Sequence, residues 1–214
     1  MNSNRRGKRK KYVSVFNHKA ETIEWETLKK IRQSLTFSEL QLIILNCNTL
    51  REKALIELAV STGIRRTDIV NIEINRINLK DQKIVFWEEK KDRLWMVAIP
   101  VEVTQTLKMY MNTLPSNQKY LFNFSGRTAY NMLQRVMRRA CIDKQLSFHD
   151  LRRTFIRLSK RMGRDIRFVM DQTGDTARVI MEEYEGYTVD EMVEMMNEDN
   201  IIRRARSTIN LWST

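Results

Sequence analysis

The chain has 214 residues, of which 42% are hydrophobic and 30% are charged, which suffices for one full-sized domain with tails. Its lysines and arginines outnumber its acidic residues by 38 to 26, and the resulting net charge of +12 favours binding to a polyanion such as nucleic acid. With two histidines, six glycines, no Cys-x-x-Cys pair and no phosphate-binding loop, we expect neither a metal nor a nucleotide cofactor.

Residues 1–34 are predicted to form a basic tail followed by a polar helix over 20–34. No apolar segment follows the basic residues, so they do not form a secretory signal. A run of about 18 apolar residues, which a membrane span requires, does not occur in the sequence. Cys47 and Cys141 lie in apolar helical contexts, where we expect buried, reduced thiols. We therefore expect a cytoplasmic protein without a membrane partner.

The next segment contains clear helix boundaries. Thr36 and Glu39 have the spacing of a capping box, and the apolar run over 40–45 predicts a buried helix behind it. A second helix is predicted over 50–62, with Gly63 as its C-terminal cap.

The periodicity then changes to that of strands. Segments 84–87 and 94–99 are rich in β-branched and aromatic residues, and the charged segment 88–93 between them predicts the turn of an antiparallel hairpin. A short strand is expected near 77–79, and Pro100 ends the sheet. From Val101 onward the pattern is helical. The sequence thus predicts a mostly α domain with a small antiparallel β-sheet (α+β) over 35–200, followed by a basic tail over 201–214.

Several residues near predicted turns and helix ends suit phosphodiester transesterification. Two guanidiniums from separate elements can clamp the non-bridging oxygens of a phosphoryl transition state. A phenol can act as the nucleophile, a lysine can protonate the leaving oxygen, and a histidine can accept a proton or orient the phosphate. The candidates are Arg65, Lys90 or Lys91, His149, Arg152 and Tyr184.

The order of these motifs resembles the tyrosine recombinase family, which includes phage and archaeal integrases and Xer proteins. The T-G-x-R motif matches 62–65, the H-x-L-R-[HR]-[ST]-F run matches 149–155, the L-G-[HW] turn matches 173–175, and the nucleophile matches Tyr184. Gly163 and Asp68 also match, and the resemblance covers roughly residues 35–190. It implies the tyrosine recombinase catalytic fold and a site-specific recombinase that cuts and rejoins double-stranded DNA through a 3′-phosphotyrosyl bond, without metal or ATP.

The resemblance also implies a homo-oligomer, a tetramer on two DNA duplexes. In this family a C-terminal segment often docks on a neighbouring protomer. The helical apolar spacing of Val189, Met192, Val193 and Met196 is compatible with such a swapped helix, although a helix packed within its own chain has the same pattern. The resemblance also implies a prokaryotic or viral protein that acts on the host chromosome in the cytoplasm.

Four points depart from the family pattern or leave alternatives open. Asp175 stands where the family has His or Trp, so it would either repel the scissile phosphate or point toward an arginine and orient it. The family spacing lands nearest Lys90, with Lys91 as the alternative, and Tyr187 is a rival to Tyr184. Only about 35 residues precede the catalytic domain, so a DNA-clamping domain is expected to be absent, in a fragment or in a minimal protein.

Other basic residues are predicted to grip the DNA backbone without reading its sequence. They are Arg127, Arg135, Arg139, Lys144 and Arg153. Two alternatives to a recombinase remain at this point: a type IB topoisomerase-like enzyme, and a catalytically inactive relative that only binds DNA.

Overall fold

The computed structural model describes residues 34–183, which belong to the second of the two units of the chain, Gln33–Thr214. Its elements follow in chain order: α2 Phe37–Leu45, α3 Leu50–Thr62, α4 Arg66–Val70, η1 Ile74–Arg76, β1 Ile77–Asn78, β2 Lys83–Glu88, η2 Glu89–Lys91, β3 Arg93–Ala98, α5 Val101–Met111, α6 Gly126–Arg139, α7 Phe148–Arg161, α8 Ile166–Thr173 and α9 Ala177–Glu183. The predicted tails, the polar helix over 20–34, Tyr184, Tyr187 and the apolar pattern over 189–196 lie outside the described residues.

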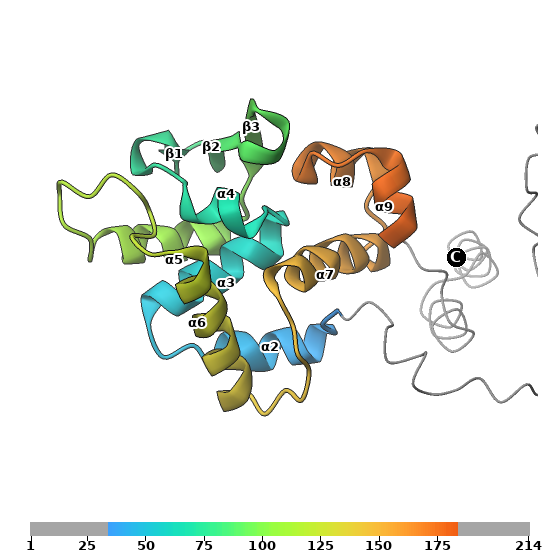
Figure 1. Ribbon diagram of the computed structural model, residues 1–214, viewed down its shortest axis with the longest axis horizontal. Helices are drawn as coiled ribbons and strands as arrows, with labels where there is room; N and C mark the ends of the chain where they lie inside the picture. Colours follow the sequence, from blue (N-terminus) through green and yellow to red (C-terminus); the bar gives the residue numbers. More distant parts are fainter. Residues whose placement is uncertain (1–33, 184–214) are drawn as a thin grey trace, which may run out of the picture. The chain divides into compact units, whose positions relative to one another are not determined.

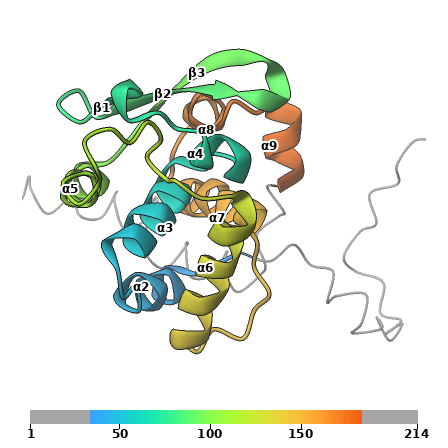
Figure 2. The same cartoon turned by 60° about the vertical axis from the view of Figure 1, so that its left-hand side comes forward.

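Helix α3 is the centre of the core. Most of its side chains are buried, including Leu55, Ile56 and Leu58, and it packs against α2, α5, α6 and α7. Its buried residues include every position from 54 to 60 except 57, so they lie on several sides of the helix, which its neighbours enclose. Figures 1 and 2 show α3 between the sheet at one end of the described unit and helices α2 and α6 at the other. The last turn of α3 therefore ends close to the sheet.

The sheet has the order β1-β2-β3 and is antiparallel throughout, as predicted. Its main hairpin is longer than expected, because Glu88 pairs with Arg93 as the last rung of the ladder. The turn therefore contains only residues 89–92. In β2 the buried positions alternate, and Glu88 follows Ile84 and Phe86 on the inner face. A carboxylate thus enters the interior at the end of an apolar face.

Helix α8 is attached to the free edge of β3 by one side chain. The buried Gln172 accepts a hydrogen bond from the backbone N–H of Ala98 (3.2 Å) and donates one to the carbonyl of the same residue (2.5 Å). This amide satisfies edge groups that would otherwise have no ladder partner. It also fixes the C-terminal end of α8, and the turn that follows, next to the hairpin.

Two glycines allow these elements to approach closely. Gly63 ends α3 at φ +66°, and a Cβ built there would lie 2.9 Å from Cδ1 of Phe155 and 3.2 Å from the methyl of Thr173. Gly174 ends α8 at φ +72°, and its Cβ would lie 2.9 Å from Nη2 of Arg93. Only glycine combines the left-handed conformation with this lack of space.

The predicted fold class and the predicted caps are confirmed. The structure has a capping box at Thr36 and Glu39 and a left-handed cap at Gly63. The prediction for the cysteines is wrong in part, because Cys47 is half-buried whereas Cys141 is exposed at φ +53°, one residue beyond the C-cap of α6. Among the helices within residues 34–183, none has the length and apolar character needed to span a membrane.

Candidate active site

Arg65 lies where α3 ends and α4 begins. Gly63 turns the chain, and Arg65 is the extended N-cap residue of α4 (φ −69°, ψ 149°). Its guanidinium points at the hairpin and at the turn after α8. One nitrogen, Nη1, donates to Glu88, and Nη2 donates to Oδ1 of Asp175 at 2.6 Å. The side chain is 20% exposed, so it lies at the border between the interior and solvent.

Arg152 projects from α7 and is buried at 3% exposure. Its Nη1 donates to the carbonyl of Gly63, and its Nη2 donates to the carbonyl of Thr173 at 2.7 Å. Burial lowers the pKa of Arg152, assisted by the charge of Arg65 and opposed by the carboxylate of Asp175. A guanidinium keeps its charge even so. Arg152 thus links the ends of α3 and α8 to the N-terminal part of α7.

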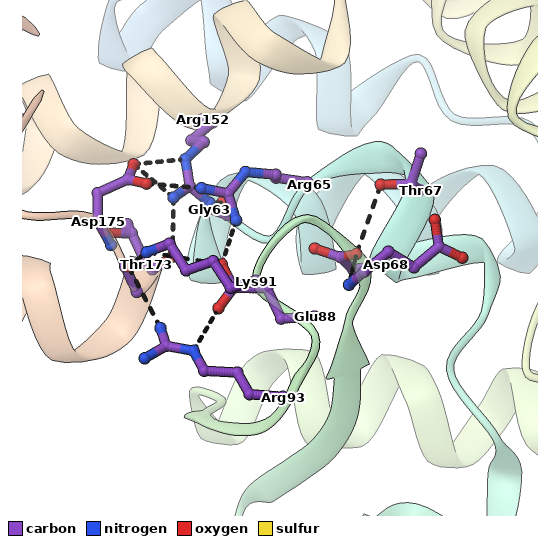
Figure 3. Close-up of polar contacts among 12 residues, drawn as sticks. Gly63, Arg65, Thr67, Asp68, Glu88, Lys91, Arg93, Arg152, Thr173 and Asp175 are labelled. Carbon is purple, nitrogen blue, oxygen red and sulfur yellow. Dashed lines mark hydrogen bonds and ion pairs between the residues drawn. The ribbon is translucent and has the colours of Figure 1, made fainter.

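Asp175 joins the two arginines. Its Oδ1 accepts from Arg65, and its Oδ2 accepts from Nε of Arg152 at 3.1 Å and from Nη2 of the same residue. Figure 3 shows this carboxylate joined by dashed lines to both guanidiniums. The sequence left two orientations open for Asp175, and the structure has the one in which the carboxylate points toward an arginine. The carboxylate contacts both Arg65 and Arg152.

Glu88 is a member of this cluster that the sequence reasoning missed. Its carboxylate is 1% exposed and accepts from Arg65 and from Nε of Arg93 at 2.7 Å, with Nζ of Lys91 at 3.9 Å. Burial alone would raise the pKa of Glu88, but hydrogen bonds from Arg93 and Arg65 outweigh it and lower the pKa. The signal was available in the alternation of β2, which places residue 88 on the inner face.

The hairpin turn separates the two candidate lysines. Nζ of Lys91 donates to the carbonyl of Gly174, next to Asp175, and the side chain is 30% exposed. Burial lowers the pKa of Lys91, opposed by Glu88. Lys90 is exposed on the same 3₁₀ turn. Within residues 34–183 it forms no hydrogen bond or ion pair with the arginines or with Asp175. The structure thus brings Lys91 into the cluster.

Asp68 fixes the start of the lysine-bearing turn. It is 1% exposed, and its Oδ1 accepts from the backbone N–H of Glu89 at 3.3 Å, the first residue of η2. Its Oδ2 has no partner within the described residues. Burial raises the pKa of Asp68, although the hydrogen bond from Glu89 and the charge of Arg65 act against this. The residue links α4 to the hairpin and does not itself reach the arginine pair.

His149 and the two arginines share a cleft. This cleft has a volume of 340 Å³ and is lined by Arg65, Arg66, Thr67, Ser147, Phe148, His149 and Arg152. His149 is exposed at the start of α7, one turn before Arg152. Two of the cleft residues are thus bound to Asp175, and His149 faces the same space. Tyr184 directly follows Glu183, the last residue of α9, and lies outside the described residues.

The cluster as a whole is cationic. Arg65, Lys91, Arg93 and Arg152 contribute four positive charges, and Glu88 and Asp175 contribute two negative ones, which leaves a net charge of +2. Arg93 is a second member that the sequence reasoning missed, and its guanidinium stacks 3.8 Å from the centre of the Trp95 ring. Such a site favours an anion. Within residues 34–183, no cluster of His, Cys, Asp and Glu has the composition of a metal site.

The residues predicted to grip DNA have different surroundings. Arg127 and Arg135 are exposed on α6. Arg139 forms an ion pair with Glu52 (2.6 Å), Lys144 with Glu39 (2.7 Å), and Arg153 with Asp150 (2.8 Å). The first two of these pairs join α6, or the loop after it, to α3 and α2. Arg139 and Lys144 thus have structural partners, and a role of these five residues in DNA binding stays a prediction.

The chain is similar to known tyrosine recombinases. The chain is 25% identical over 159 residues to a tyrosine recombinase of Agathobacter rectalis, covering 70% of this chain and 52% of that protein. It is 23% identical to tyrosine recombinase XerA of Pyrococcus furiosus, covering 87% and 69%. The chain therefore spans between about half and two thirds of the length of these relatives.

Two solved structures share the fold. The XerA recombinase has a TM-score of 0.70 and 24% identity, covering 78% of this chain and 64% of that one. The catalytic domain of bacteriophage HP1 integrase has a TM-score of 0.55 and 22% identity, covering 70% and 85%. The fold is thus that of a tyrosine recombinase catalytic domain. The profile of the phage integrase family matches residues 33–185, and the chain belongs to this family.

Proposed function

We propose that the chain is a DNA strand-transferase of the site-specific recombinase type. The observation that carries the proposal is the pair of guanidiniums, Arg65 and Arg152, held at one anionic group beside a cleft that also contains His149. Planar guanidiniums from two elements match the non-bridging oxygens of a phosphodiester. Stabilising the charge on those oxygens lowers the barrier to phosphoryl transfer.

In the proposed reaction the phenol oxygen of Tyr184 attacks the scissile phosphorus. The bond to the 5′-oxygen breaks, and a 3′-phosphotyrosyl ester forms on the DNA strand. The released 5′-hydroxyl of a partner strand then attacks this ester and regenerates the phenol. The number of phosphoester bonds is conserved in each step, so the cycle balances without a co-reactant.

Lys91 is our candidate for the proton donor to the leaving 5′-oxygen. It reaches the turn between α8 and α9, and a lowered pKa makes its ammonium a better acid. His149 lines the cleft and is placed to orient the phosphate or accept the phenol proton. Substituting Lys91→Ala should slow cleavage strongly, whereas Lys90→Ala, its neighbour on the same turn, should have little effect.

A 5′-bridging sulfur in the substrate tests this assignment. A thiolate leaves without a proton, because the pKa of a thiol is far below that of an alcohol. The Lys91→Ala variant should therefore cleave the sulfur substrate nearly as fast as the unaltered protein does. If sulfur rescues Lys90→Ala instead, the proton donor is Lys90.

The test of the proposed function is the covalent adduct. The full chain is incubated with a pool of nicked duplexes of random sequence, in which the cleaved fragment diffuses away and traps the ester. Adducts that resist detergent are isolated, and their DNA is sequenced. We expect adducts with the unaltered chain and with Tyr187→Phe, but none with Tyr184→Phe. Adducts that persist in Tyr184→Phe would assign the nucleophile elsewhere.

A relative that binds DNA without cutting it is the second candidate. It is favoured by one observation, the carboxylate of Asp175 at the arginine pair. DNA binding without any adduct from the random pool would support it. Relaxation of supercoiled plasmid without recombinant products would support a topoisomerase-like enzyme instead.

We also propose that strand exchange uses a tetramer on two duplexes, because four strands have to be cut and rejoined. The described unit has an apolar groove of 260 Å³ between α2, α3 and α7, lined in part by Phe37, Leu40, Val60 and Leu158. The segment 189–196 has apolar spacing suited to such a groove on a neighbouring copy. Sedimentation with and without DNA, for the full chain and for one ending at residue 188, tests this. An enzyme with this substrate would act in the cytoplasm of a prokaryotic cell.

A further inference from the structure

One carboxylate occupies donors of both arginines in the cleft. One oxygen of Asp175 accepts a hydrogen bond from Nη2 of Arg65, and the other accepts hydrogen bonds from Nε and Nη2 of Arg152. The two non-bridging oxygens of a phosphodiester would present the same two acceptors to the same two guanidiniums. A phosphate and the Asp175 carboxylate therefore cannot use these donors together. Their negative charges would also repel at such a distance.

The other acceptors around Arg152 are fixed in place. Its remaining partners are the backbone carbonyls of Gly63 and Thr173, which end two helices and cannot rotate away. Asp175, by contrast, is a side chain on the short turn between α8 and α9, and its own side chain is 9% exposed. Rotation of this side chain is the smallest movement that would release donors on both arginines.

The second carboxylate at Arg65 is placed differently. Glu88 is paired within the β-ladder, is 1% exposed, and also accepts from Arg93. Glu88 therefore neutralises part of the charge of Arg65, Lys91 and Arg93, and its loss would leave these three cations to repel one another. Among residues 34–183, the Asp175 carboxylate accepts hydrogen bonds only from Arg65 and Arg152, which a phosphate would also contact, and its backbone N–H donates to the hydroxyl of Thr173.

We propose that Asp175 is an internal substitute for the scissile phosphate, which blocks the arginine pair until a DNA phosphate displaces it. This rests on the proposed role of Arg65 and Arg152 as phosphate ligands. The apparent affinity of the site for phosphate is then reduced by the small fraction of molecules in which Asp175 has moved away. DNA that supplies many other backbone contacts can offset this reduction, whereas a lone phosphate cannot.

Inorganic phosphate is the probe, and the full chain is the sample. Binding is measured as the rise in unfolding temperature with added phosphate, relative to sodium chloride at equal ionic strength. Asp175→Asn keeps an acceptor at the arginines but removes the charge. We expect this variant to bind phosphate at least about tenfold more tightly than the unaltered chain, since charged hydrogen bonds become available.

Asp92→Asn is the matched control. It makes the same change of charge on the neighbouring hairpin turn, where residue 92 is exposed at φ +49°, a conformation that asparagine tolerates. We expect its phosphate affinity to equal that of the unaltered chain. If both variants gain equally, the effect is one of general charge and the proposal is overturned. The gain of Asp175→Asn should also disappear when Arg65→Gln is added.

Loss of Asp175 can also weaken the fold, and the assay allows for this. Even if Asp175→Asn or Asp175→Ala is less stable, added phosphate should raise its unfolding temperature by more than it raises that of the unaltered chain. If Asp175→Asn and Asp175→Ala bind phosphate no better than the unaltered chain, Asp175 holds the arginines in place and the proposal is wrong. The phosphate assay measures no cleavage, so its result stands even if no covalent DNA adduct is found. If an adduct forms but Asp175→Asn does not bind phosphate more tightly, only the proposed role of Asp175 is refuted, and the proposed function is not.

Discussion

Two glycines with nearly equal φ angles allow the cost of close packing to be measured separately from the cost of the left-handed conformation. Gly63 has φ +66° and Gly163 has φ +69°. A Cβ at Gly63 would lie 2.9 Å from the buried Phe155 ring, whereas a Cβ at Gly163 would have nothing within 4 Å. Alanine at either position has to adopt the left-handed conformation, which costs about 1–2 kcal/mol. Only alanine at Gly63 has the additional clash.

Gly163→Ala should therefore lower the free energy of unfolding by about 1–2 kcal/mol. Gly63→Ala should lower it by about 1–3 kcal/mol more, the usual cost of forcing an extra carbon into a packed interior. For a chain of this length each kcal/mol corresponds to roughly 2–4 °C in the unfolding temperature.

Urea and thermal unfolding, followed by circular dichroism on both variants, give the two values. Equal losses would mean that the Phe155 ring moves aside freely, and the argument that Gly63 is required for close packing would fail. A larger loss for Gly163→Ala would contradict the geometry altogether.

Three further predictions concern reactivity, pH and salt. Burial, assisted by Glu52 and Glu57, raises the pKa of Cys47 to about 11, so iodoacetamide at pH 8 should alkylate the exposed Cys141 well before Cys47; mass spectrometry of the digested protein would show the reverse order if this is wrong. The fold lowers the pKa of Glu88 from its ordinary 4.5, so the Glu88 carboxylate stabilises the folded state fully above that pH and loses this effect as the pH falls through the folded pKa. The unfolding temperature should therefore drop more steeply below about pH 4.5 in the unaltered chain than in Glu88→Gln. Parallel curves of unfolding temperature against pH for the two proteins would refute this. DNA affinity should fall steeply with salt, and Arg127→Ala should reduce the slope of log affinity against log salt by about one; an unchanged slope would remove Arg127 from the interface.

Elements with local signals could be predicted from the sequence. The capping box at Thr36 and the glycine at residue 63 depend only on neighbours within a few positions, and both appear where expected. The hairpin was also recognised, from two segments rich in β-branched and aromatic residues. Its turn was predicted too long, because charged residues at 88 and 93 suggested solvent, whereas they form the last pair of the ladder.

Contacts between distant segments could not be predicted in this way. Arg139 and Lys144 suggested DNA contacts because they belong to a basic stretch, yet their carboxylate partners lie 87 and 105 residues away. The choice between Lys90 and Lys91 depends on which side of a 3₁₀ turn faces Gly174, and spacing along the chain does not contain that information. The same holds for Asp175, whose two partners come from α7 and from the start of α4.

The two carboxylates of the cluster illustrate why a residue type alone does not define a role. Glu88 comes from a strand whose register fixes its position, and it receives three cations, so removing it would leave like charges close together. Asp175 comes from a turn and receives two cations that the incoming substrate would also neutralise. The first carboxylate is therefore required in both states of the site, with and without a bound phosphate. In our proposal the second occupies the arginine pair only while the phosphate is absent, so an acidic residue is compatible with a site that binds an anion.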